Sequence, residues 1–365
     1  MREQDGLTRV QLQHGDTAWL VTRYDEVRAA LSDPRISADI TNPRLPVAVH
    51  GRPTFARMDD PDHARLRRVF TSAFTVKNVN LMRRAIETVV DRTLTAFAGG
   101  RNPADLMRGY ALPIPSQVIC LILGVPYEDH QFFEEHSATL FDQGLPADRK
   151  QAALTALYTY THRLLTDRLT APSPGLIGQQ AVLIARGELD LDEAAVSTMA
   201  LLVAGHETTS SMIALSTLVL LQHPDQLARL RDSDDPTVVA RAVEELLRYI
   251  TIAETAAVRV ATDDVEIGGH LVRKDEGLMM CLPSANRDGK FAGADDLDLG
   301  RDARGHVAFG FGVHQCLGQN LARLELQIAL PVLLRRLPGL KLAVPLEELR
   351  MRLGILSVDE LPVTW

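Results

Sequence analysis

Apolar residues recur with a helical period through most of the chain. The clearest helical patterns lie at residues 24–33, 60–74, 80–97, 235–250 and 319–336. Apolar positions spaced by three or four residues form one face of a helix. Proline and glycine interrupt these patterns near residues 144–146 and 172–175. The fold is therefore predicted to be mainly α.

Two shorter segments predict a small β part. Residues 10–22 alternate around His14-Gly15-Asp16, which is typical of a hairpin, and residues 257–272 contain strand-like runs around Gly268-Gly269. Residues 42–57 form a long loop, and long loops in compact domains are often functional. The chain has no internal repeat and no low-complexity linker, so residues 1–365 are predicted to form one domain.

The longest apolar tract, residues 196–221, is long enough to span a bilayer, but its centre holds His206 and Glu207. Ionisable residues at mid-span are costly in lipid. A helix through the core of a soluble protein is therefore favoured, with no membrane association. The N-terminus lacks the apolar segment of a signal peptide.

Composition narrows the function classes. Hydrophobic residues make up 46% of the 365 residues and charged residues 24%, as in ordinary globular proteins. The net charge of -8 argues against bulk nucleic-acid binding. The three cysteines are far apart and odd in number, so a disulfide framework is not expected. This cysteine usage fits the reducing cytoplasm, and a cytoplasmic location is therefore expected.

Cys316 lies in a glycine-rich loop, residues 306–318, at the entrance of the helix predicted over 319–336. A dinucleotide fingerprint is weak, because the third glycine would fall at Gln315. Three interpretations stay open: a nucleophilic thiol with His314 as its base, a thiolate ligand of haem iron, and a buried structural cysteine.

The sequence AGHETT, residues 204–209, stands at the middle of the long apolar tract. A zinc-protease motif would need histidine at Ser210, so zinc is not favoured. Adjacent Glu207 and Thr208 can form a short proton relay, or they can simply be polar residues packed in a helix. Glu245 and Arg248 share one helix face and, taken alone, predict only an ion pair.

Four further groups could hold a dicarboxylate. His63 and Arg67 lie four residues apart on a predicted helix, Arg259 lies in a strand-like segment, and His314 precedes Cys316 by two positions. Haem carries two propionates, and arginine suits carboxylates geometrically. Each residue alone is more typical of solvated surface.

Together these motifs resemble the cytochrome P-450 superfamily of haem-thiolate monooxygenases, in particular its soluble actinobacterial members. The cysteine-loop pattern fits through Phe309, Gly312, Cys316 and Gly318, and AGHETT fits the oxygen-binding helix. Glu245, Arg248 and Arg301 match the family's structural ion cluster. Members usually carry a further proline-rich stretch before the first hairpin, so the native chain is expected to begin earlier.

The resemblance implies a single-domain cytochrome P-450 fold, with haem b between the oxygen-binding helix and the cysteine-loop helix. It implies Cys316 as the axial ligand of the iron, and His63, Arg67, Arg259 and His314 as propionate ligands, with Ala204 beside the cofactor. Glu207 and Thr208 would be the acid–alcohol pair for oxygen activation. Gly205 is expected to open the helix enough to free Thr208 from its own backbone.

The implied reaction inserts one oxygen atom of O2 into a bulky apolar substrate by hydroxylation or epoxidation. A polyketide macrolactone of secondary metabolism is the expected class. Electrons would come from NAD(P)H through ferredoxin reductase and ferredoxin, and the protein is expected to be a monomer. The pocket would be lined by residues 42–57, 130–175, 196–209, 253–257 and 353–356. A haem sensor or carrier and a metal-free cysteine hydrolase are the alternatives.

Overall fold

The computed structural model describes residues 6–12, 17–46, 52–142, 144–171, 174–253, 257–352 and 354–365. The chain divides into two compact units. Unit 1 comprises residues 1–67, 233–319 and 354–356, and unit 2 comprises residues 68–232, 320–353 and 357–365. The single domain expected over residues 1–365 stays a prediction.

Unit 1 contains a five-stranded sheet with the order β1-β2-β8-β5-β3. The strands are β1 (Leu7–Gln11), β2 (Thr17–Val21), β3 (Ile36–Ser37), β5 (Val258–Ala261) and β8 (Gly277–Met280). β1 and β2 form the predicted hairpin, although its turn lies outside the described residues. β8 pairs in parallel with β2 and antiparallel with β5, so segments far apart in sequence are joined in one sheet.

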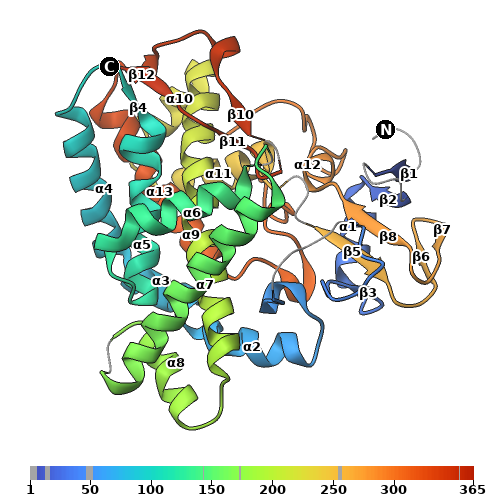
Figure 1. Cartoon of the computed structure of the whole chain (residues 1–365). Helices are drawn as coiled ribbons and strands as arrows, with labels where there is room; N and C mark the ends of the chain where they lie inside the picture. Colours follow the sequence, from blue (N-terminus) through green and yellow to red (C-terminus); the bar gives the residue numbers. More distant parts are fainter. Residues whose placement is uncertain are drawn as a thin grey trace. The chain divides into compact units, whose positions relative to one another are not determined.

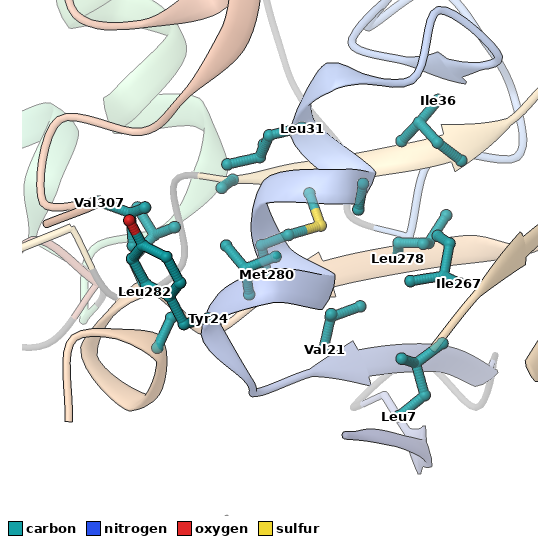
Figure 2. Close-up of a cluster of buried hydrophobic side chains, with 14 of the residues drawn as sticks. Leu7, Val21, Tyr24, Leu31, Ile36, Ile267, Leu278, Met280, Leu282 and Val307 are labelled. Carbon is teal, nitrogen blue, oxygen red and sulfur yellow. The ribbon is translucent and has the colours of Figure 1, made fainter. Parts of the chain in front are cut away.

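Helix α1 (Tyr24–Ser32) covers one face of this sheet (Figure 2). Its buried residues include Tyr24, Val27 and Leu31, which recur at helical spacing. They meet alternate residues of the strands in a core that also includes Val21 and Leu278. The short hairpin of β6 (Val265–Ile267) and β7 (His270–Val272) turns at the predicted Gly-Gly pair and adds apolar residues to this core.

Unit 1 also contains α11 (Pro236–Ile250) and the short helix α12 (Leu282–Ala285). The predicted ion cluster is present. Arg248 donates to both carboxylate oxygens of Glu245, at 2.7 and 2.8 Å, and Arg301 donates to the same carboxylate. Arg248 also donates to the carbonyls of Asn286 and Ala294. Glu245 and Arg248 are buried, and Arg248 is bonded to backbone, so this pair holds the irregular segment after α12 in place.

Unit 2 is helical. Its helices are α3 (Val76–Leu81), α4 (Arg83–Ala98), α5 (Pro113–Leu123), α6 (His130–Phe141), α7 (Ala147–Thr170), α8 (Leu176–Ala185), α9 (Leu191–Gln222) and α10 (Pro224–Arg231), together with the end of α2 (Asp62–Thr71) and nearly all of α13 (Gln319–Arg336). The long apolar tract forms α9, which packs against α5, α6 and α7 (Figure 1). No described helix combines the length and apolar composition of a membrane span.

Several polar residues along α9 bond to the backbone of their own helix. The hydroxyls of Ser211 and Thr217 donate to carbonyls four residues earlier, and His206 Nδ1 lies 2.7 Å from the Leu202 carbonyl oxygen. Back-bonding of this kind lets polar side chains lie in an apolar interior. Asp190 caps the helix by accepting from the backbone amides of Asp192 and Glu193.

Short strands complete unit 2. β4 (Ala104–Asp105), β12 (Pro362–Thr364) and β9 (Lys341–Leu342) form one small sheet. β10 (Met351–Arg352) and β11 (Ser357–Val358) form a separate antiparallel pair, and β11 packs on α9. Ser211 of α9 donates to the Ser357 hydroxyl over 2.9 Å, which fixes this strand pair against the helix.

Candidate active site

The cysteine loop of unit 1 is shaped by its glycines. Gly310 and Gly312 have φ values of +69° and +73°, and a Cβ on Gly312 would collide with the Leu31 carbonyl. The amide of Cys316 donates to the Phe309 carbonyl at 2.9 Å, which closes the loop just before α13. The Cys316 side chain is exposed, so its sulfur is accessible to a ligand.

The other two cysteines differ from Cys316. Cys120 is buried in unit 2, and burial raises the pKa of its thiol to about 12. Cys281 is partly buried in unit 1. A thiol that keeps its proton is a poor nucleophile and a poor metal ligand. Of the three, Cys316 therefore has the setting best suited to bind a metal.

The four predicted anion-binding residues gather around this loop in unit 1. The rings of His63 and His314 lie 4.3 Å apart between centroids. Arg67 donates to the carbonyl of Gln315 at 2.6 Å, and its charge interacts with Cys316. Arg259 is buried and lies close enough to His314 for its charge to lower the pKa of that histidine. The structure thus brings together residues that lie far apart in the sequence, from His63 to His314.

This cluster has the electrostatics of an anion site. Burial, followed by the charges of Arg259, His63 and Arg67, lowers the pKa of His314 to about 3. Burial and the charge of Arg57 lower the pKa of Arg259 to about 10. Like charges buried together are unfavourable unless a counter-ion joins them.

Three buried nitrogen atoms in the described part of this cluster lack a hydrogen-bond partner: His63 Nε2, His314 Nδ1 and Arg57 Nη1. Buried polar atoms are rarely left unpaired, so these atoms point to an anionic ligand. The two carboxylates of haem fit that donor set, and the exposed Cys316 sulfur fits its iron. No described heavy atom lies within 4 Å of where a Cβ would stand on Gly310 or Gly318, so the loop also leaves space beside it.

Arg57 is a candidate that the sequence analysis missed. It ends a short 3-10 turn, Phe55–Arg57, within the segment predicted to be a loop. The residue is only partly buried, but its Nη1 is fully buried and desolvation lowers its pKa. A basic residue among prolines and apolar residues, just before the helix that carries His63, was the available signal.

Ala204, Glu207 and Thr208 lie on α9 in unit 2. The Thr208 hydroxyl donates to the Ala204 carbonyl at 2.7 Å, and the helix is continuous from Leu191 to Gln222. The expectation that Gly205 frees Thr208 from its backbone is therefore wrong. Gly205 serves close packing instead, since a Cβ there would lie 2.6 Å from Cδ1 of Ile119 on α5.

Glu207 is buried, with ionisable neighbours on three elements. Burial raises the pKa of its carboxyl to about 7, against the lowering effect of Arg352 and with a further increase from Glu134. Arg352 Nη1 lies 3.9 Å from Oε2, and His206 Nε2 lies 3.7 Å from Oε1. Burial lowers the pKa of His206 to about 4, so this histidine is neutral. A carboxyl with a pKa near neutrality can both accept and donate a proton.

The region expected to bind substrate is only partly included in the described residues. Residues 47–51 of the 42–57 loop, residues 254–256 and Leu353 lie outside the described residues, as do residues 143 and 172–173. Within unit 1, the segments near residues 253 and 355 lie together, since the Leu356 amide donates to the Ile252 carbonyl and Ala253 bridges to Ile355. The substrate pocket stays a prediction.

Comparisons with known proteins identify the family of the chain. The family model for cytochrome P450 matches residues 176–340. Cytochrome P450-SU2 of Streptomyces griseolus is 52% identical over 369 residues, covering 98% of this chain and 90% of the relative. Vitamin D3 dihydroxylase, also of Streptomyces griseolus, is 47% identical over 380 residues, covering 100% and 92%.

Among solved structures, the mycinamicin VIII C21 methyl hydroxylase MycCI of Micromonospora griseorubida, bound to mycinamicin VIII, superposes with a TM-score of 0.94 at 41% identity, covering 100% of this chain and 95% of that chain. The chain therefore belongs to the cytochrome P450 family and has its mainly helical fold. It is an oxidoreductase of the monooxygenase class, and the family implies a haem cofactor and electrons from an external redox system.

Proposed function

We propose that this chain is a haem-thiolate monooxygenase in which Cys316 would be the thiolate ligand of the haem iron and His63, Arg67, Arg259 and His314 would hold the two propionates. The supporting observation is the buried cationic cluster beside the cysteine loop, with its unpaired His63 and His314 nitrogens. Haem supplies the redox chemistry that activates dioxygen, and a thiolate ligand favours O–O cleavage. The glycines and the hydrogen bond from the Cys316 amide to the Phe309 carbonyl fix the backbone that carries the sulfur.

In this proposal, Glu207 and Thr208 are the catalytic residues that supply protons, and Ala204 lies beside the cofactor. The carboxyl of Glu207 has a pKa near 7 and can exchange protons at neutral pH. The Thr208 hydroxyl is held by the Ala204 carbonyl, so its oxygen lone pairs are fixed in direction. A positioned hydroxyl next to an acid can order a water molecule that carries the proton.

The proposed electron source is NAD(P)H, acting through a ferredoxin reductase and a ferredoxin. Arg65 and Arg68 of α2 are both exposed, and Arg323 of α13 follows the cysteine loop in sequence. Surface arginines can steer the approach of an acidic partner protein even when the net charge of the whole chain is -8. A monomeric state and a cytoplasmic location, which the small number of cysteines suits, are part of the same proposal.

The proposed substrate is a bulky apolar metabolite such as a polyketide macrolactone, taken by hydroxylation or epoxidation. Relatives named for hydroxylation of vitamin D3 and of mycinamicin VIII support this size class. The exposed apolar surface of Ala204 on α9 agrees with it, because the side chain is small and leaves space beside the helix.

The test is reconstitution. Purified protein is incubated with NAD(P)H, a ferredoxin reductase, a ferredoxin and a panel of apolar natural products, and oxygenated products are identified by mass spectrometry. We expect a product whose mass increases by one oxygen atom and whose formation needs every component. A haem protein that binds compounds from the panel and never oxygenates them would instead be a sensor or carrier. A colourless protein with thiol-dependent hydrolysis would identify a cysteine hydrolase.

A further inference from the structure

Asn286 joins the end of α11 to the start of the cysteine loop in unit 1. The residue is fully buried and directly follows α12. Its Nδ2 donates to the Thr251 hydroxyl oxygen at 2.8 Å, and its Oδ1 accepts from the Val307 amide at 2.7 Å. Because the backbone N–H of Val307 can only donate, Oδ1 must face Val307 and Nδ2 must face Thr251. The side chain of Asn286 is therefore held in one orientation.

Thr251, at the other end of this contact, ends α11 in an unusual backbone conformation. Its φ is +44°, in the left-handed region that a β-branched residue rarely adopts. Its hydroxyl donates to the Arg248 carbonyl at 2.7 Å and accepts from Asn286. A strained conformation persists only where surrounding bonds impose it, and such places are often functional. These bonds fix the position of the hydroxyl oxygen, and through it the position of the Asn286 side chain.

Two further hydrogen bonds lead from Val307 to Cys316. The Val307 carbonyl accepts from the Gly310 amide at 2.8 Å, and the Phe309 carbonyl accepts from the Cys316 amide at 2.9 Å. The two bonds close consecutive turns of the loop, so the place of Val307 limits the place of Cys316. Val307 is itself fully buried in the apolar core of unit 1 (Figure 2).

We propose that Asn286 is a positioning residue for Cys316 and that the strained end of α11 is the fixed point from which it acts. Arg248, paired with Glu245, holds the backbone carbonyl of Asn286. The side chain of Asn286 carries that placement onward to the Val307 amide. Without Asn286, this amide would be buried with no acceptor, and the first turn of the loop would open. The inference rests on the proposed role of Cys316 as the ligand of the haem iron.

The position of the loop matters because a cysteine binds a metal as the thiolate. Hydrogen bonds around a metal ligand set its orientation and its affinity for the metal. A loop that can shift lets the sulfur move away and take a proton. Asn286 should therefore act on the state of the Cys316 sulfur, through the backbone of the loop, without contacting the substrate.

The first experiment measures the loop in the haem-loaded protein by amide hydrogen exchange at single-residue resolution. Thr251→Val removes the hydroxyl at a residue outside the loop and keeps the side-chain volume. If Asn286 acts as proposed, exchange of the Val307 amide should become roughly 5-fold faster or more, because its acceptor is no longer held. Asn286→Leu should have a larger effect, to which Thr251→Val adds nothing. Thr251→Ser, which keeps the hydroxyl, should exchange as wild type does.

Thr22→Val is the matched control. The Thr22 hydroxyl is also buried in unit 1, but it donates to the Gly6 carbonyl. This variant should leave exchange of the Val307 amide unchanged. Wild-type exchange in Thr251→Val would overturn the role of the α11 end, and wild-type exchange in Asn286→Leu would overturn the whole proposal. Equal acceleration at the amides of β5 and β8 would also overturn it, because Asn286 would then only stabilise unit 1.

The second experiment follows the bond between sulfur and iron. The red-shifted Soret band of the reduced carbon monoxide complex reports this bond, and circular dichroism reports the helices. In a urea titration, Asn286→Leu and Thr251→Val should lose the band further ahead of the helical signal than wild type does. Val272→Ala, which weakens the unit 1 core at a buried position of β7, is the control and should not widen that interval. An equal interval in all four proteins would leave Asn286 a role in stability alone and overturn the proposal.

Failure of the inference and failure of the proposed function can be told apart. If Cys316→Ser keeps the red-shifted band, Cys316 is not the iron ligand, and both proposals are wrong. If Cys316→Ser loses the band but Asn286→Leu matches wild type in Val307 exchange and in the urea titration, Cys316 is the ligand and its loop is positioned by other contacts. That result overturns the inference alone.

Discussion

Arg57 and Arg259 lie close enough together inside unit 1 for the charge of Arg57 to lower the pKa of Arg259. The two come from distant segments, a short turn before α2 and the strand β5. Arg259 Nη1 donates to the Val258 carbonyl, and the Asp59 carboxylate offsets part of the repulsion. Two arginines held in this way favour an anion between or beside them.

We predict that Arg57→Ala and Arg259→Ala each weaken haem retention. Loss of a hydrogen-bonding cation from a buried carboxylate costs about 1–3 kcal/mol, which corresponds to a roughly 5-fold to 150-fold faster release of haem. Transfer of haem to an excess of apomyoglobin measures the release rate. Arg35→Gln, an exposed arginine of unit 1 paired with Asp33, is the control and should not change it.

For the haem-free protein, the repulsion between Arg57 and Arg259 predicts the opposite effect on stability. Removing Arg57 relieves repulsion with Arg259, so apoprotein stability should stay equal or rise while haem retention falls. A variant that loses stability equally with and without haem would show that Arg57 only supports the fold.

A second prediction concerns the iron ligand. Reduced protein with carbon monoxide should show the red-shifted Soret band of thiolate-ligated haem, and Cys316→Ser should lose it. Cys120→Ser and Cys281→Ser, which alter the buried and the partly buried cysteine, should keep it. Retention of the band in Cys316→Ser would exclude this cysteine as the ligand.

Local patterns predicted the helices well. The helix expected over 319–336 is α13 with the same bounds, and that over 235–250 is α11. The helix expected over 80–97 is divided at Met82: residues 80–81 end α3, which Thr75 caps at its other end, and α4 begins at Arg83. The parallel pairing of β2 with β8 could not be predicted, since nothing local specifies which distant strand fills a sheet position.

Some residues of the candidate site could likewise be predicted from the sequence, and others could not. Cys316 and Glu207 were predicted because glycines, or a polar break in an apolar helix, mark them in the sequence. Arg57 and Arg352 were missed because a lone arginine in a loop or a short strand is typical of solvated surface. Only the fold shows that Arg57 buries Nη1 and that Arg352 faces Glu207.

Glu207 should make stability fall as pH rises. Its pKa is about 7 in the folded protein and 4.5 ordinarily, so the folded state binds the proton more tightly. Stability from this group is complete below about pH 4.5 and is lost as pH rises through 7, by roughly 3 kcal/mol in total. Wild type should therefore lose more thermal stability between pH 5 and pH 8 than Glu207→Gln does.

Comparing these two proteins isolates Glu207. The other carboxyls with raised pKa values in unit 2, those of Glu134 and Glu325, are present in both and cancel in the difference. Melting midpoints of haem-loaded protein at several pH values provide the measurement. Parallel curves for the two proteins would mean that Glu207 is not protonated at neutral pH.

Gly205 permits a prediction about packing. Alanine normally stabilises a helix by up to about 1 kcal/mol over glycine, but a Cβ at this position would lie 2.6 Å from Cδ1 of Ile119. Overpacking costs about 1–3 kcal/mol, so Gly205→Ala should be destabilising. In a double-mutant cycle with Ile119→Ala, the combined loss should be smaller than the sum, and additivity would rule out the contact as the cause.

The final prediction separates chemistry from packing at Thr208, whose hydroxyl donates its proton to the Ala204 carbonyl. If the oxygen of that hydroxyl orders the proton-carrying water, Thr208→Val should keep side-chain volume, haem content and substrate affinity, and should divert reducing equivalents from product to hydrogen peroxide. Thr208→Ser, which keeps the hydroxyl and loses only a methyl group, should stay coupled.

Product and peroxide are measured on one sample per NAD(P)H consumed. If Thr208 only packs, the opposite results are expected. Thr208→Ser would then lose stability and Thr208→Val would not, and the product-to-peroxide ratio would be equal in wild type and both variants. That equal ratio would remove Thr208 from the proton path and leave Glu207 to act through water alone.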